Sequence, residues 1–108
     1  MPAPPSPPDG SAPVLTDAEL ELLAEAIREH RFVTVRYNRG ASTLAPYGTF
    51  TKRDELYLTA VTIARDGVQP SRLKVGTFKA AGLSNLQATP VPFSAAALWA
   101  QVERHARR

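Results

Sequence analysis

The residues of this sequence best suited to chemistry are basic side chains that accompany aromatic residues. The bases are Arg36, Arg72, Lys74 and Lys79, and the aromatic residues are Tyr47 and Phe50. Lysine and arginine neutralise phosphates, and aromatic rings stack on nucleobases. If these residues converge on one face of the fold, they form a groove for nucleic acid or for a nucleotide. Spacing alone leaves a second interpretation open, in which the bases are scattered and the aromatic residues belong to the core, as we expect for Tyr37 and Tyr57.

Patterns typical of enzymes are absent from the sequence. It has no cysteine, no Gly-rich phosphate loop and none of the histidine motifs of metal-dependent catalysis. The two histidines, His30 and His105, fall at the ends of predicted helices, where a positive charge is favourable, and have no partner at metal-ligand spacing. The carboxylates among the predicted strands, Asp54, Glu55 and Asp66, fall at turns, where solvation explains them. We therefore expect no enzymatic activity, no metal and no cofactor.

The net charge of +3 is unevenly distributed along the chain. Residues 16–30 carry mostly acids, whereas residues 31–93 carry mostly bases. A basic surface favours anionic partners such as nucleic acid. A simpler explanation, that arginine keeps a small domain soluble, accounts for the charge equally well.

Two predicted helices flank the strand region. The first spans residues 17–30 and begins with a capping box, in which Thr16 and Glu19 bond to each other's backbone. Its apolar residues recur at helical spacing on one side, and its acids occupy the other. The second spans residues 95–107, and its Trp99 belongs to an apolar side that can dock on the strands.

Five strands are predicted between the helices. They cover residues 32–38, 42–50, 55–63, 69–79 and 83–88. The strand at 55–63 is apolar on both faces, so we expect it to be central and buried on both sides. Pro46 cannot donate to a ladder, which predicts an edge, a bulge or a bend, and Gly76 suggests another bend. The predicted fold is therefore mainly β, a small five-stranded barrel with an N-terminal amphipathic helix and a C-terminal helix.

The Pro-rich start of the chain differs in composition from the rest. Residues 1–13 offer too little apolar surface to offset the entropy of ordering them, so we expect a disordered tail. A single domain is predicted over residues 14–107. The sequence has neither the pattern of a secretory signal nor an apolar run long enough to span a membrane, so we expect a cytoplasmic protein without a membrane partner.

Four short segments, taken in order, match the pattern of a known family. They are Val33-Thr34-Val35-Arg36-Tyr37, Leu44-Ala45-Pro46, Leu56-Tyr57-Leu58-Thr59-Ala60 and Thr77-Phe78-Lys79-Ala80-Ala81-Gly82-Leu83, with Phe93 ten residues further on. Together they resemble the WYL domain, which is named for a Trp-Tyr-Leu triplet on its central strand. The resemblance spans residues 20–93.

This resemblance implies a Sm-like or SH3-like barrel and a regulatory function. WYL domains occur mostly in bacterial or phage-borne regulators, where the barrel binds a negatively charged ligand and usually follows a winged helix-turn-helix domain. In 108 residues we expect no such domain beside the barrel. We therefore expect a stand-alone, accessory transcriptional regulator that binds a nucleotide or nucleic acid, single-stranded rather than duplex. The residues that we expect to carry this binding are those of the basic and aromatic pattern, namely Arg36, Arg72, Lys74 and Lys79 for phosphates, with Tyr47 or Phe50 as the stacking surface.

The sequence departs from the family pattern at several positions. Leu56 replaces the naming Trp, Ser42 and Gly82 replace basic residues, and Lys79 replaces an arginine. Lysine keeps the charge but lacks the planar fork that binds phosphate with two bonds. The alternative function is therefore a protein-interaction or homo-oligomerisation module that has lost the family's ligand site.

Overall fold

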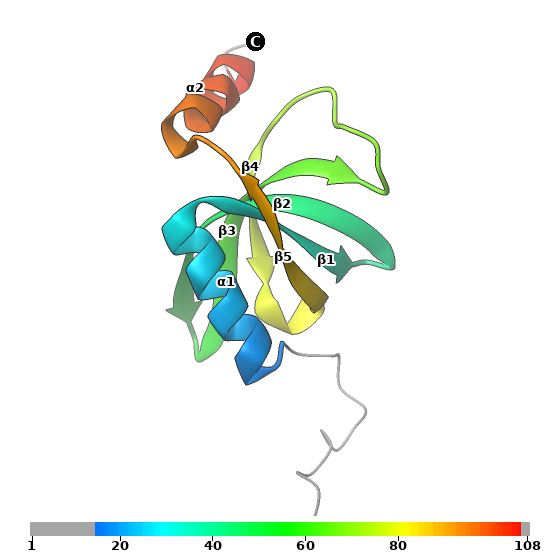
Figure 1. The fold of residues 1–108 in the computed structure, drawn as a ribbon, viewed down its shortest axis with the longest axis vertical. Helices are drawn as coiled ribbons and strands as arrows, with labels where there is room; N and C mark the ends of the chain where they lie inside the picture. Colours follow the sequence, from blue (N-terminus) through cyan, green and yellow to red (C-terminus); the bar gives the residue numbers. More distant parts are fainter. Residues whose placement is uncertain (1–14, 107–108) are drawn as a thin grey trace, which may run out of the picture.

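Figure 1 shows a five-stranded antiparallel sheet with one helix packed across it and a second helix beyond one end. The computed structural model describes residues 15–106. The tail predicted over residues 1–13 and the helix end predicted at Arg107 lie outside these residues. Helix α1 (Asp17–Glu29) precedes the sheet, and helix α2 (Ala95–Ala106) follows it. The predicted mainly β fold with two flanking helices is therefore confirmed.

The strands form one sheet in the order β4-β3-β2-β1-β5. Their bounds are β1 Arg31–Tyr37, β2 Gly40–Lys52, β3 Glu55–Arg65, β4 Val75–Lys79 and β5 Ser84–Pro92, with the 3-10 helix η1 (Ala80–Gly82) between the last two. Two-residue turns, Asn38-Arg39 and Arg53-Asp54, join the first three strands, and all of these turn residues have positive φ. Such turns match the twist of a hairpin and fix the register of its strands.

Closure of the sheet into a barrel is not found. Within residues 15–106 the sheet is open, and β4 and β5 are its edges. The predicted end of the last strand at Ala88 was also wrong, because β5 continues to Pro92, which pairs with Arg31. An edge strand pairs on one side only. A proline is tolerated there when its nitrogen, which has no hydrogen to donate, faces away from the ladder.

The two faces of the sheet are buried by different parts of the chain. We call the face that packs against α1 the inner face and the opposite one the outer face. On the inner face, Leu58 of β3 is fully buried in a cluster with Leu23 of α1. On the outer face, Val61 of the same strand is fully buried in a cluster with Val102 of α2. Strand β3 is therefore buried on both sides, as its sequence predicts.

A β-bulge interrupts β2 next to its proline. Pro46 lies opposite Ala60 and Gly48 opposite Thr59, so Tyr47 is an extra residue without a partner on β3. A bulge is one of the few places where an interior strand tolerates proline. The bend predicted at Gly76 does not interrupt the pairing of β4. The register between β4 and β3 is unshifted across this residue.

The strand predicted over residues 69–79 is shorter in the structure. Only Val75–Lys79 pairs with β3, and residues 69–74 form no strand. Pro70 lacks the donor that a ladder needs, and the turn at Asp66-Gly67 directs the chain away from the sheet. This segment therefore connects β3 to β4 instead of extending the sheet.

Glu19 links the start of α1 to the edge of the sheet. Its Oε1 accepts from the Thr16 backbone at 2.8 Å, and its Oε2 accepts from the Leu86 backbone of β5 at 2.9 Å. The backbone bond from Thr16 is the main reason that the pKa of Glu19 is lowered from 4.5, a shift that desolvation opposes. Because the folded state favours the ionised form, this contribution to stability is present above the unfolded pKa and is lost as the pH falls through the folded pKa.

We expect Glu19→Ala to lower the free energy of unfolding by about 1–2 kcal/mol at neutral pH, since two backbone donors lose a charged acceptor. The difference from the wild type should shrink as the pH falls below 4.5. Urea denaturation at neutral pH and at acid pH measures both effects. Glu19→Gln is the matched control, because it keeps an acceptor and removes the titration. An alanine variant whose deficit stayed constant with pH would contradict the role of the carboxylate.

Candidate nucleic-acid interface

An aromatic row crosses the outer face of the sheet near the β2–β3 turn. Phe50 of β2 lies opposite Tyr57 of β3, which in turn lies opposite Lys79 of β4. The rings of Phe50 and Tyr57 are stacked, with centroids 5.3 Å apart and planes 12° apart. We call these three residues the aromatic row. The structure thus brings together two predicted site residues, Phe50 and Lys79, and inserts Tyr57 between them.

The aromatic row is accessible and carries positive charge at one end. Phe50 is 42% exposed, and Tyr57 is half-buried. Lys79 Nζ lies 3.0 Å from Glu55 Oε1, and this hydrogen bond and the negative charge of Glu55 raise the pKa of Lys79. Lys52 lies opposite Glu55 on the neighbouring strand. Lys79 therefore stays charged beside the rings of Phe50 and Tyr57. A cation next to exposed aromatic rings is the combination that single-strand binding sites use.

The basic segment Arg72-Leu73-Lys74 lies at the other end of β4. Arg72 and Lys74 are exposed, whereas Leu73 packs into the outer-face cluster with Leu98. A groove of about 430 Å³ lies between this segment and α2, and His105 lines it on the helix side. Arg72 and Lys74 therefore flank an apolar groove instead of projecting from a strand.

Strand β4 connects the basic segment to the aromatic row. Val75, Thr77 and Lys79 are exposed on the outer face, as the pairing of Val75 with the outer-face residue Val61 requires. At about 3.3 Å per residue, the path from Val75 to Lys79 is about 13 Å long. The two sites thus form the ends of one surface along the strand.

The remaining predicted site residues lie elsewhere. Arg36 is exposed on the outer face of β1, between Ala41 of β2 and Ser84 of β5. Strand β1 is three positions from β4 in the sheet, which separates Arg36 from the basic segment and from the aromatic row. The structure therefore does not gather the four predicted bases on one spot.

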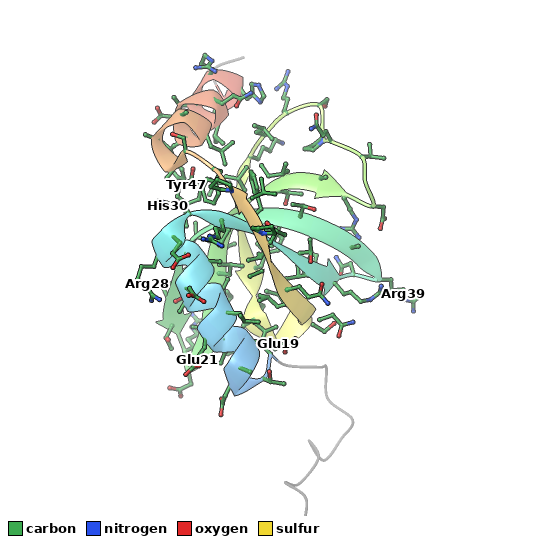
Figure 2. All side chains as sticks on the ribbon, in the orientation of Figure 1. Glu19, Glu21, Arg28, His30, Arg39 and Tyr47 are labelled. Carbon is green, nitrogen blue, oxygen red and sulfur yellow. The ribbon has the colours of Figure 1, made fainter. Side chains whose placement is uncertain are left out.

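Tyr47 belongs to the attachment of α2. Its hydroxyl donates to the Ala95 carbonyl oxygen at 2.7 Å, and its ring lies edge-on to Trp99 with centroids 5.2 Å apart. Burial raises the pKa of this hydroxyl. Figure 2 shows Tyr47 between the sheet and α2, whereas Arg39 lies at the far tip of the first hairpin. This position explains the tyrosine as an anchor, and it leaves Phe50 and Tyr57 as the available stacking surface.

Two residues of the site, Tyr57 and His105, were not predicted as site residues from the sequence. Tyr57 was expected in the core, although the turn Arg53-Asp54 fixes the pairing that places it beside Phe50. His105 was expected to interact as a cation with the end of its helix. Instead, its Nδ1 accepts a hydrogen bond from the Leu73 backbone at 2.7 Å.

Residues 15–106 offer neither a metal-binding cluster nor a membrane-spanning helix. They contain no group of three or more His, Cys, Asp or Glu side chains placed to hold a metal ion. No helix in this part of the chain has the length and apolar character needed to cross a membrane.

Comparison with known protein families gives a match over most of the sheet. The model of the WYL domain family matches residues 18–81, which is more than half of the 108 residues of the chain. The chain has no significant match among curated proteins or among solved structures. WYL domains generally have ligand-sensing and regulatory functions. The matched region includes α1 from Ala18 onward, the first three strands and β4, and thus every residue of the aromatic row and of the basic segment. The chain therefore belongs to the WYL domain family.

Proposed function

We propose that this WYL domain binds single-stranded nucleic acid on the outer face of its sheet, as a regulatory sensor without catalytic activity. The observation that carries the proposal is the exposed stack of Phe50 and Tyr57 with Lys79 directly beside it. Rings of this kind stack on bases of any sequence, and the adjacent ammonium group neutralises the backbone phosphate. Accessory control of transcription is the expected role of such binding.

The arrangement favours a strand over a mononucleotide or a duplex. The basic segment and the aromatic row lie at opposite ends of β4, about 13 Å apart, so one nucleotide cannot occupy both. A duplex stacks its bases inside the helix, where Phe50 and Tyr57 cannot reach them, whereas a single strand exposes them. We therefore place the bases on the aromatic row and further phosphates at Arg72 and Lys74.

Phe50→Ala should weaken the binding of a single-stranded oligonucleotide of about 12 nucleotides by about 1–3 kcal/mol, because it removes one stacking surface. Lys79→Gln should reduce the slope of log K against log salt by about 0.7, the value for one phosphate contact on a single strand. Fluorescence anisotropy with labelled single-stranded DNA, single-stranded RNA, duplex DNA and a nucleotide, each at two salt concentrations, measures both effects.

Val91→Ala is the matched control for these variants. Val91 is 52% exposed on β5, at the opposite edge of the sheet from β4, so its removal should leave binding unchanged. Equal affinity of the wild type and Phe50→Ala for every single strand would contradict the proposed stacking surface. If the protein bound the nucleotide and none of the single strands, the ligand would be a nucleotide and the proposed strand binding would be wrong.

A second candidate function, a protein-interaction or homo-oligomerisation module, is favoured by the charge of α1. Glu21, Glu25 and Leu22 are exposed on this helix, on the side away from the inner-face core. An acidic helix can complement the basic surface of a second copy. Size-exclusion chromatography with light scattering tests this function, and a stable oligomer that ignores nucleic acid would favour it over the sensor.

A further inference from the structure

The connection between β3 and β4 carries two of the proposed phosphate ligands but belongs to no strand. Arg72 and Lys74 lie in this connection, just before β4 begins at Val75. Figure 1 shows the connection arching beyond the sheet at the end of the molecule where α2 lies. Basic side chains on such a segment bind well only if something holds the segment in place, because ordering it on binding costs free energy.

Within residues 15–106, one hydrogen bond holds the backbone of residues 69–73. Over residues 69–73 the described structure contains no backbone-to-backbone hydrogen bond. The Leu73 N–H instead donates to Nδ1 of His105 at 2.7 Å, in a half-buried position. The Leu73 side chain is anchored on the same side, in the cluster that contains Leu98. His105 therefore takes the place of the ladder partner that this stretch lacks.

The chemistry of the bond defines the state of the histidine. An imidazole nitrogen accepts a hydrogen bond only when it carries no proton, so the ring is neutral and its proton is on Nε2. Arg72 and Lys74, one position on either side of Leu73, are the charged side chains of the connection that line the groove beside His105. The bond thus fixes the backbone between the two bases and leaves both exposed.

We propose that His105 is a positioning residue for nucleic-acid binding. Through the Leu73 N–H it holds Arg72 and Lys74 beside the start of β4, at the groove that they line with Val75. The inference rests on the proposed function and deepens it, since it makes α2 part of the binding machinery. A ligand then meets two cations whose backbone is already ordered, and it does not bear the cost of ordering them.

The test compares His105→Ala with His105→Asn. The side-chain oxygen of asparagine can accept from Leu73 much as Nδ1 does, whereas alanine offers no acceptor. Amide hydrogen exchange of Leu73, measured by NMR, reports the bond, and anisotropy with the single-stranded DNA of about 12 nucleotides reports binding. We expect His105→Ala to lose the protection of Leu73 and about 3- to 10-fold in affinity, the range expected for one hydrogen bond. His105→Asn should keep both.

Two controls separate positioning from a general loss of structure. The double variant Arg72→Ala, Lys74→Ala should lose affinity without a change in Leu73 exchange. In the wild type, the ¹⁵N shifts of His105 should show the neutral ring with its proton on Nε2.

Several results would overturn the inference. One is a His105→Ala variant that loses the protection of the Leu73 amide but keeps its affinity for single-stranded DNA. Another is a His105→Asn variant whose affinity is as low as that of His105→Ala. A wild type that binds none of the single strands would instead refute the proposed function. In that case the exchange of Leu73 would still show whether His105 holds the segment.

Discussion

Replacing Leu58 with alanine should lower the free energy of unfolding by about 2–5 kcal/mol. Leu58 is fully buried on the inner face, where it shares a cluster with Leu23 of α1 and with Leu44 of β2. Its strand lies inside the sheet, between β2 and β4, so neighbouring backbones cannot collapse into the space that alanine leaves. Urea denaturation followed by circular dichroism measures the loss.

Leu22→Ala is the matched control for Leu58. It removes the same atoms from a leucine on α1 that is 38% exposed, and it should change stability by less than about 0.5 kcal/mol. If the two variants lost similar amounts of stability, the inner face would not be the core of the domain.

The second large effect is expected at Tyr47, where alanine should cost about 2–3 kcal/mol. The substitution removes a half-buried ring that contacts both Trp99 and Phe93, together with the hydroxyl that donates to the Ala95 carbonyl. Trp99 is the single tryptophan of the chain, so its fluorescence reports the attachment of α2. We expect its emission to shift to longer wavelength in Tyr47→Ala, because the indole becomes more exposed to water.

Tyr47→Phe separates the ring from the hydroxyl. It keeps both aromatic contacts and leaves the Ala95 carbonyl without this donor, which should cost about 1 kcal/mol with little change in Trp99 emission. A phenylalanine variant as unstable as the alanine variant would show that the hydrogen bond, and not the ring, attaches α2.

Elements that depend on local chemistry were predicted closely from the sequence. The capping box of α1 forms as expected, with Glu19 N donating to Thr16 Oγ1 at 3.1 Å. Its components lie within one turn of helix, so no distant part of the chain decides the outcome. By contrast, β4 is shorter than predicted, because the length of a strand depends on the partner that pairs with it. Arg72, Leu73 and Lys74 continue the alternation of β4 in the sequence but form no strand in the described structure.

The candidate site was predicted in part, for a related reason. Period-two alternation places Phe50 and Tyr57 on defined faces of their strands, but it does not say which face stays accessible. That depends on where α2 docks, and α2 covers the outer face at Val61 while Phe50 remains exposed. Arg36 illustrates the same limit, because the order of strands in the sheet separates it from the other bases.

The bulge at Tyr47 determines which way Phe50 faces. Ala45 points to the outer face, so strict alternation would send Phe50, five positions later, to the inner one. The unpaired residue shifts the count by one and returns the ring to the outer face, opposite Tyr57. A strand of the same length without the bulge would therefore turn the ring into the hydrophobic core and place Thr49 on the outer face instead. The bulge and the number of residues in this stretch must therefore change together. A relative with one residue fewer between Pro46 and Phe50 keeps the ring on the outer face only if its strand is regular, without the bulge.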